Sequence, residues 1–216
     1  ICRHREVRKD GEERFFELEA SPLWNEDGTL HGFLEIVRNI SDDLSMEAQL
    51  REHQERLYHL VHHDTLTSLP NRLLLQDRLQ RMMVKAKRTG TNVGIVFLDL
   101  DRFKKINETL GHEVGDKLLV NVANVLENCV RKSDTVARLG GDEFGVILDD
   151  LKDVKFAAVV AKKILEALSR PIFVGEYELY ATCSIGISVF PADSDNVEGL
   201  LRCADTALYR AKDGGK

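Results

Sequence analysis

Two acidic clusters in this sequence have the composition of a site that handles phosphate groups. Asp99-Leu100-Asp101 closes an otherwise apolar run, and Asp142-Glu143 follows the glycine pair Gly140-Gly141 between two further apolar runs. A carboxylate at the end of a buried strand is costly unless it is paired or binds a cation, and paired glycines let a ligand approach the backbone closely. Either cluster by itself is typical of a solvated turn. Together they match the carboxylates on neighbouring strand ends that hold Mg²⁺ (or Mn²⁺) in phosphoryl transfer.

Residues 64–216 alternate helical and strand patterns, and these patterns predict the elements that must position the acids. Strands are expected at Asn92–Leu100, Thr135–Leu139, Glu143–Leu148, Ile172–Val174 and Tyr177–Val189, and helices at Asn71–Arg88, Gly115–Val130, Val154–Ser169 and Val197–Ala211. The second and third strands flank the glycine pair as the arms of a hairpin would. This order of elements predicts a layered α/β domain with a mixed central sheet flanked by helices.

Residues 1–40 form a separate predicted part. Strand patterns around Ile1–Arg8, Arg14–Ala20 and Leu30–Asn39 are separated by turn signals at Lys9-Asp10-Gly11 and Asn25-Glu26-Asp27-Gly28. They predict a three-stranded antiparallel meander, which buries little surface by itself. The strand order and the Asp-Gly turn resemble the C-terminal half of a PAS sensor domain. The alternative is an unrelated hairpin packed on its neighbour.

A single helix is expected between the two parts, from Ser41 to His63. Ser41 is a good N-cap, and the acids that follow it suit the positive end of the helix dipole. Two heptad series run along one side of the helix and are apolar at four of six positions: Asp43, Leu50 and Leu57 in one, Met46, His53 and Leu60 in the other. This seam favours a short parallel coiled coil between two copies of the chain. An amphipathic helix packed within its own chain is the alternative.

The composition excludes several classes of protein. Hydrophobic residues make up 43% and charged residues 31% of the chain, as in ordinary globular proteins. Thirty Lys and Arg against 36 Asp and Glu give a net charge of −6, and no basic block indicates a duplex nucleic-acid partner. No apolar run reaches the ~18–20 residues that span a bilayer, and the first residues lack a signal-peptide pattern. Four scattered cysteines are typical of free thiols in a reducing compartment. A cytoplasmic location is therefore expected, although a longer protein could be tethered to a membrane.

Five motifs occur in order along residues 64–212. The segment Arg138–Phe144 reads Arg-Leu-Gly-Gly-Asp-Glu-Phe, and the other four are Asp64–Arg72, Asp99–Asn107, Gly111–Asp116 and Ala204–Lys212. In composition and spacing they resemble the GGDEF family, the diguanylate cyclases. The resemblance implies a domain over residues 64–216 that is similar to the palm of nucleotidyl cyclases and polymerases. The PAS-like fragment (1–40) and the linker helix (41–63) would precede it.

The resemblance also implies a reaction and its catalytic groups. A homodimer would join two GTP into cyclic di-GMP and release two pyrophosphates. Asp99 and Asp142 would be metal ligands together with the Leu100 carbonyl. Glu143 would be a further ligand or would help to deprotonate the attacking 3′-hydroxyl. Lys212 would neutralise the departing pyrophosphate, since stabilisation of phosphate charge supplies most of the catalysis in such reactions.

Further residues match the substrate contacts of the family. The backbone amides of Phe103 and Lys104, in the turn that opens a short helix, suit the β- and γ-phosphates. Asn107 and Asp116 resemble the pair that reads guanine. A carboxylate accepts hydrogen bonds from both N1–H and N2–H₂ of guanine, which adenine cannot offer, so ATP is disfavoured. Lys216 stands where the family often has arginine, and it brings a charge without the planar fork.

Arg131 and Asp134 match the RxxD motif at which the product inhibits members of this family. Arg131 would stack on guanine or bind phosphate, and Asp134 would read a guanine edge. By spacing alone, an Arg and an Asp three residues apart are commoner as a surface ion pair.

The alternative function is a regulatory one. A GGDEF module can bind GTP or cyclic di-GMP and control an adjacent domain, for example an EAL phosphodiesterase domain of a longer protein. The complete set of acidic, guanine-reading and lysine residues favours the enzyme.

Overall fold

The computed structural model describes residues 2–7 and 13–214, with every side chain except that of Glu47. The chain divides into two compact units, Ile1–His59 and Leu60–Lys216. Within the described residues, no helix combines the length and the apolar character that crossing a bilayer requires.

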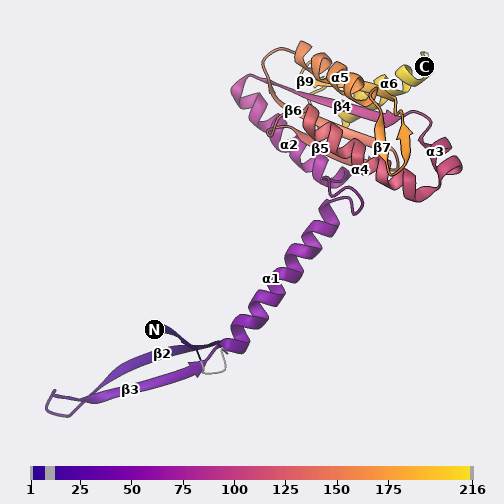
Figure 1. Cartoon of the computed structure of the whole chain (residues 1–216). Coiled ribbons are helices and arrows are strands. Elements are labelled where there is room, and N and C mark those ends of the chain that lie inside the picture. The colour runs from indigo at the N-terminus through magenta and orange to yellow at the C-terminus, as the bar shows by residue number, and fades with distance from the viewer. Residues whose placement is uncertain (1, 8–12, 215–216) are drawn as a thin grey trace. The chain divides into compact units, whose positions relative to one another are not determined.

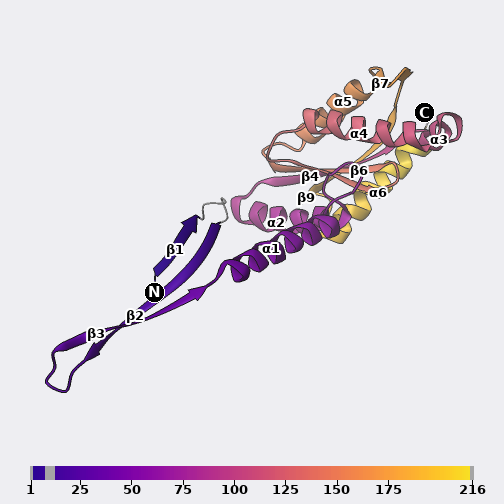
Figure 2. The same cartoon turned by 60° about the horizontal axis from the view of Figure 1, so that its bottom comes forward.

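The first unit begins with the expected antiparallel meander. Strands β1 (Cys2–Val7), β2 (Glu13–Trp24) and β3 (Leu30–Asn39) form a sheet in the order β1-β2-β3. Figure 1 labels β2 and β3, and Figure 2 shows β1 as well. The predicted Asn25–Gly28 turn joins β2 to β3, and the Asp27 carboxylate accepts hydrogen bonds from the amide and hydroxyl of Thr29. The turn predicted at Lys9-Asp10-Gly11 lies outside the described residues. The relation of this meander to a PAS domain stays a prediction.

Helix α1 (Ser41–His62) follows the meander, as predicted to within one residue. Its start is fixed to β2, because the Phe15 amide donates to the Ser41 hydroxyl at 2.8 Å and the Ile40 amide donates to the Phe15 carbonyl. The four apolar residues of the heptad seam are all at least 58% exposed: Met46, Leu50, Leu57 and Leu60. The meander of the first unit therefore does not cover the predicted seam.

In the described part of the second unit, five complete helices and a small hairpin accompany a central four-stranded sheet. The helices are α2 (Arg72–Thr89), α3 (Phe103–Leu110), α4 (His112–Cys129), α5 (Lys155–Leu168) and α6 (Val197–Asp213). The central strands are β4 (Asn92–Leu100), β5 (Thr135–Gly140), β6 (Glu143–Leu151) and β9 (Cys183–Phe190), in the order β5-β6-β4-β9. A separate hairpin pairs β7 (Ile172–Val174) with β8 (Tyr177–Leu179). The predicted α/β class with a central sheet and flanking helices is confirmed.

One detail of the predicted sheet is wrong: all three pairings in it are antiparallel, not mixed. The helical crossovers do join strands that run in the same direction, β4 to β5 and β6 to β9. However, each crossover skips one place, so β6 lies between β4 and β5, and β4 lies between β6 and β9. This is the split β-α-β arrangement of ferredoxin-like folds.

Two predicted elements also need correction. The strand expected over Tyr177–Val189 is interrupted at residues 180–182, and its two pieces belong to different sheets. The helix expected from Gly115 starts three residues earlier, at His112. Glycine is a poor helix former, but here a Cβ at position 115 would lie 1.8 Å from the Asn107 Oδ1 atom, so close packing of α3 on α4 requires it.

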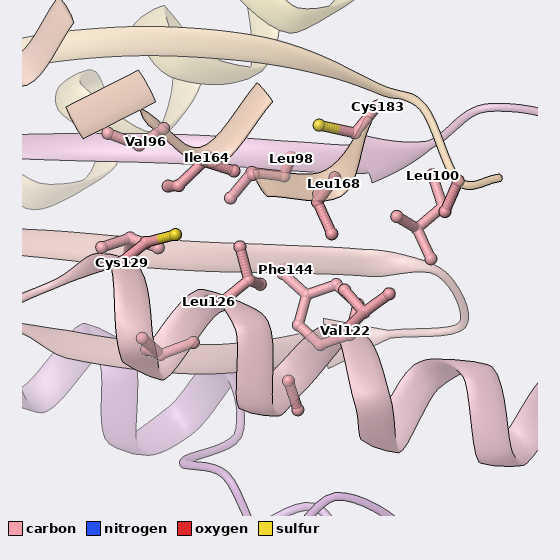
Figure 3. Packing of buried hydrophobic residues seen from close by; sticks show 14 of the residues in the cluster. Val96, Leu98, Leu100, Val122, Leu126, Cys129, Phe144, Ile164, Leu168 and Cys183 are labelled. Carbon is pink, nitrogen blue, oxygen red and sulfur yellow. The ribbon is translucent and has the colours of Figure 1, made fainter. Parts of the chain in front are cut away.

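The helices cover both faces of the sheet. In Figure 2, α4 and α5 lie on one side of the central strands, and α2 and α6 lie on the other. Successive residues of β4 alternate between these layers, as the pleat of a strand requires. Val96, Leu98 and Leu100 pack in the cluster with α4 and α5, whose members Figure 3 shows from close by. Val93, Ile95 and Phe97 pack in the cluster with α2 and α6.

Candidate active site

The alternation along β4 decides which helix the catalytic candidate Asp99 meets. Asp99 continues the series Val93, Ile95 and Phe97, whose side chains face α2 and α6. Its carboxylate forms an ion pair with the Lys212 ammonium of α6, with an Nζ–Oδ2 distance of 2.5 Å. The Asp99 side chain is only 14% exposed. The structure therefore brings together two site residues that lie 113 positions apart in the sequence.

A glycine on β9 makes this approach of α6 possible. A Cβ at Gly186 would lie 2.1 Å from the Ala204 carbonyl oxygen and 2.3 Å from the Leu208 amide nitrogen. Both atoms belong to the α6 backbone, which cannot move aside as a flexible side chain can. Any larger residue at position 186 would lift α6 from the sheet and move Lys212 away from Asp99.

Asp142 lies at the tip of the β5–β6 hairpin, beside Asp99. The tip is formed by Gly140 and Gly141, whose φ angles of 144° and 51° are ones that other residues rarely adopt. Burial raises the pKa of the Asp142 carboxyl, and the negative charge of Asp99 raises it further, while Lys212 and Arg138 act in the opposite direction. Asp99 and Asp142 bring two negative charges against the one positive charge of Lys212. A divalent cation would neutralise the remaining negative charge.

The donor set fits Mg²⁺, although the described residues contain no group of three or more His, Cys, Asp or Glu side chains that could hold a metal. Mg²⁺ usually keeps several waters and takes only one or two protein carboxylates besides phosphate oxygens. Asp99 and Asp142 supply two carboxylates. Backbone pairing holds the two segments together, since the Leu100 amide donates to the Asp142 carbonyl at 3.3 Å.

Glu143 is held on the same face of the sheet as Asp99. The two residues are direct partners in the β4–β6 register, and opposite residues of an antiparallel pair point to the same side. The Glu143 carboxylate lies 3.4 Å from the Arg72 guanidinium at the start of α2. Arg72 thus orients the acid that follows Asp142.

The hairpin tip is braced by Arg138, whose role could not be assigned from the sequence. Its guanidinium donates twice to the Gly141 carbonyl, at 3.0 and 2.7 Å, and to both carboxylate oxygens of Asp64, at 3.0 and 3.1 Å. Burial tends to raise the pKa of Asp64, but hydrogen bonds from Thr67 and the charge of Arg138 outweigh it and hold that pKa below its ordinary value. In the sequence, the only indication of this contact was that Arg138 and Asp64 each belong to one of the five motifs.

The first turn of α3 carries the two backbone amides that the resemblance assigns to phosphate binding. Arg102 occupies the N-cap with a φ of 59°, and no side chain caps the helix. The amides of Phe103 and Lys104 stand at this uncapped end, directly after Asp99-Leu100-Asp101. Uncapped amides at the positive end of a helix dipole attract phosphate.

The guanine candidates Asn107 and Asp116 belong to facing helices. The Oδ1 atom of Asn107 is buried and has no hydrogen-bond partner, and it touches Gly115, the residue before Asp116. Asp116 lines a cleft of about 360 Å³ together with Leu66 and Val120. An unpaired buried acceptor is costly unless a ligand donates to it.

The inhibitory candidates form a tight turn. Both oxygens of Asp134 accept from backbone amides, Oδ2 from Arg131 at 2.9 Å and Oδ1 from Asp149 at 3.2 Å. Asp134 is thus a turn residue in this state, and the Arg131 side chain is exposed. The side-chain ion pair weighed as an alternative is not among the ion pairs of the described residues. Lys216 lies outside the described residues.

The second unit is a ferredoxin-like α/β domain that carries an acidic pair, Asp99 and Asp142, with a lysine on Asp99, at one end of its sheet. Residues 61–216 match the family model "Diguanylate cyclase, GGDEF domain". The chain therefore belongs to the GGDEF family.

The relatives show the variety of proteins that carry this domain. The chain is 41% identical over 169 residues to the diguanylate cyclase TpbB of Pseudomonas aeruginosa, covering 78% of this chain and 39% of TpbB. It is 40% identical over 166 residues to the cyclic di-GMP phosphodiesterase PdeR of Escherichia coli, covering 77% of this chain and 25% of PdeR. The chain thus spans well under half the length of these curated relatives.

Solved structures agree with the fold. The GGDEF domain of TpbB superposes with a TM-score of 0.70 at 41% identity, over 72% of this chain and 91% of that one. The coiled coil and GGDEF domain of DgcB from Caulobacter crescentus, solved with c-di-GMP, gives a TM-score of 0.73 at 30% identity. That match covers 82% of this chain and 94% of the solved DgcB chain.

Proposed function

We propose that this chain is a diguanylate cyclase that condenses two GTP into cyclic di-GMP and releases two pyrophosphates. The observation that carries the proposal is the coupled pair Asp99 and Asp142, with Lys212 on Asp99, inside a GGDEF domain. The diguanylate cyclase TpbB, at 41% identity, supports the same reaction.

The acidic groups divide the work between them. Asp99, Asp142 and the Leu100 carbonyl would hold Mg²⁺ (or Mn²⁺), which supplies positive charge to the phosphate under attack. Glu143, oriented by Arg72, takes the proton of the attacking 3′-hydroxyl or serves as a second-metal ligand. Lys212 would be released from Asp99 when a bound metal ion neutralises that carboxylate. The Lys212 ammonium would then stabilise the departing pyrophosphate.

Two sets of groups hold the substrate. The amides of Phe103 and Lys104 bind the β- and γ-phosphates at the uncapped end of α3. Asn107 and Asp116 read guanine: Asp116 accepts from N1–H and N2–H₂, and the unpartnered Asn107 oxygen accepts from the amino group. Adenine would leave both acceptors unpaired. Lys216 is proposed as a further phosphate contact.

A homodimer is required by stoichiometry. One domain holds one GTP, so its 3′-hydroxyl must attack a GTP bound to a second copy. The exposed seam of α1 would bring two chains together as a parallel coiled coil. The DgcB structure, which contains a coiled coil and a GGDEF domain, supports this assembly.

Product inhibition through Arg131 and Asp134 belongs to the same proposal. The exposed guanidinium of Arg131 is available to stack on guanine or to bind phosphate, and Asp134 would accept from a guanine edge. That DgcB was solved with c-di-GMP supports binding of this product in the family.

The deciding experiment is incubation of the chain with GTP and MgCl₂, followed by chromatographic detection of cyclic di-GMP and pyrophosphate. Asp99→Asn should lower the rate by at least ~100-fold, since a metal ligand acts on the transition state. Asp150→Asn is the matched control, because Asp150 is exposed at the far end of β6 from Glu143. Equal rates in the wild type and Asp99→Asn would remove Asp99 from the catalytic centre.

A regulatory module is the second candidate, because the phosphodiesterase PdeR is also 40% identical over this region. In that case the chain binds GTP or cyclic di-GMP and controls an adjacent domain, such as an EAL domain, without turnover. Saturable GTP binding in calorimetry with no cyclic di-GMP formed would favour this candidate over the enzyme.

A further inference from the structure

Helix α3 has a second face that the nucleotide site does not use. Phe103 and Asn107 lie one turn apart and pack on Gly115 of α4. Arg102, Lys105, Ile106, Thr109 and Leu110 follow the spacing of one helical face, and they line a cleft of about 540 Å³. The far side of the cleft is formed by Tyr180 and Thr182, in the segment that separates β8 from β9. Its volume falls within the range of ~300–1,000 Å³ that is typical of small-molecule sites.

The floor of this cleft is fixed by a set of hydrogen bonds around Asp101. Its two carboxylate oxygens accept from the hydroxyls of Thr182 and Ser184, both at 2.9 Å. The Asp101 amide donates to the Thr182 carbonyl at 2.9 Å. These bonds tie the segment 180–182 to the end of β4, so the two walls of the cleft are held in place before any ligand arrives.

The charges and the apolar surface of the cleft indicate what it would hold. Within the described part of the chain, neither Arg102 nor Lys105 forms an ion pair, whereas Lys104 lies 3.8 Å from Glu108. The lining thus has two uncommitted positive charges against one carboxylate, Asp101, which already accepts two hydroxyl hydrogen bonds.

The rest of the lining is apolar or aromatic. Ile106 and Leu110 offer apolar surface, and residue Tyr180 is 64% exposed. The Tyr180 hydroxyl donates to Glu178 at 2.9 Å, and this bond favours one orientation of the ring, whose face is a stacking surface. Cations beside an apolar wall and an aromatic ring favour a planar ligand that carries negative charge.

We propose that this cleft is a binding site, separate from the nucleotide site, for a small aromatic anion: a planar ring that carries a carboxylate or a phosphate group. The ring lies between Tyr180 and Ile106, and the anionic group meets Arg102 and Lys105.

The site also has a regulatory consequence, which rests on the proposed function. The cleft and the proposed phosphate and guanine contacts share α3, and Arg102 is both a lining residue and the N-cap of that helix. A ligand that binds Arg102 changes the setting of the amides of Phe103 and Lys104. Occupation of the cleft therefore changes the rate of GTP turnover.

Binding is tested with 2-naphthoate and 1-naphthyl phosphate as probes, by ¹⁵N–¹H correlation spectra of the whole chain with excess GTP and no divalent metal. Saturable shifts are expected at the amides of Lys105–Leu110 and Tyr180–Thr182. If only the phosphate probe binds and GTP displaces it, that probe occupies the nucleotide site and the proposal is overturned. Absence of saturable shifts with both probes overturns it as well.

Two variants separate shape from charge. Thr109→Trp fills the cleft from an exposed helix position and should abolish binding of both probes. Arg102→Gln with Lys105→Gln should weaken binding at least 10-fold, while the matched pair Arg88→Gln with Lys155→Gln should leave it unchanged. Equal affinities in the two charge-removing pairs would contradict the proposed role of the cations. Retained binding in Thr109→Trp, with its spectrum otherwise native, would place the ligand elsewhere.

The regulatory consequence has its own readout. At GTP concentrations below saturation, a saturating probe should change the initial rate of the wild type at least twofold and that of Thr109→Trp not at all. Binding by the spectra with an unchanged rate would overturn the regulation but not the site. A chain that makes no cyclic di-GMP would fail the proposed function, and the spectra would still decide on the site.

Discussion

The two units of this chain use their apolar residues in opposite ways. In the unit Leu60–Lys216, alternate residues of β4 are buried on both faces of a sheet, under α4 and α5 on one side and α2 and α6 on the other. In the unit Ile1–His59, β3 carries Phe33, Leu34, Ile36 and Val37, all more than half exposed. Apolar strand content therefore does not by itself make a core; a second layer must cover it.

This contrast explains where precise chemistry can be built. A carboxylate such as Asp99 is held to one lysine because the strand and the helix that carry the pair are packed against each other through Gly186. The exposed surfaces of the first unit offer contact area instead. They suit the association proposed above, since the apolar residues of the α1 seam are exposed.

The largest expected difference between the units is in stability. Leu126→Ala, at a fully buried position, should lower the free energy of unfolding by about 3 kcal/mol, from lost burial and the cavity left behind. Leu34→Ala, at a position 51% exposed, should change it by less than ~0.5 kcal/mol. Urea unfolding followed by far-ultraviolet circular dichroism measures both. Equal losses would show that Leu34 is covered in solution and would weaken the contrast.

The next effect concerns association through α1. Leu50→Asp with Leu57→Asp places two charges in the seam, so dimers should dissociate and specific activity should fall more steeply at low protein concentration. Sedimentation velocity and rates over a range of concentrations measure this. Ser45→Asp with Ala48→Asp adds the same charge away from the seam and should leave the dimer intact. If both pairs behave alike, the effect is one of charge and the seam has another role.

Much of the second unit could be predicted because its signals are local. The bounds of β4 were predicted residue for residue, since an apolar run that ends in Asp99-Leu100-Asp101 marks its own limit. The hairpin of β5 and β6 followed from Gly140-Gly141. The N-cap of α2 at Asn71 also agrees with the predicted start of that helix.

The features that could not be predicted depend on packing between distant segments. The pattern over Tyr177–Val189 is continuous in the sequence, but Asp101 binds Thr182 and Ser184, and the chain leaves the edge hairpin there to enter the central sheet. The ion pairs of Lys212 with Asp99 and of Arg138 with Asp64 likewise join residues from separate motifs. Lys212 could be assigned to the site from the resemblance to the GGDEF family, but not from its spacing to Asp99 in the sequence.

Product feedback gives a smaller expected effect, confined to one surface. Arg131→Ala removes a guanidinium outside the acidic pair, so basal turnover should persist while the concentration of cyclic di-GMP for half inhibition rises at least ~10-fold, equivalent to about 1.4 kcal/mol of lost binding. Titration of cyclic di-GMP at saturating GTP measures it, and inhibition should not be relieved by more GTP. Arg88→Ala is the control. Identical inhibition curves would make Arg131 an ordinary surface residue, whose contacts contribute at most ~1 kcal/mol.

The smallest effect should come from the acidic pair itself, where the requirements of the fold and of the site conflict. Burial and Asp99 raise the pKa of Asp142 in the folded chain above its unfolded value, so the ionised group costs stability once the pH is above the unfolded pKa of about 3.8. Asp142→Asn should therefore raise the melting temperature at pH 7 and leave it nearly unchanged at pH 3, where Asp142 is protonated in both states. Mg²⁺ should raise the melting temperature of the wild type more than that of Asp142→Asn, because it neutralises the same repulsion. Calorimetric scans at the two pH values, with and without MgCl₂, measure all of these shifts, with Asp150→Asn as the control. A variant that is less stable than the wild type at pH 7 would mean that Asp142 is a favourable structural contact, and the acidic pair would then need no metal to explain it.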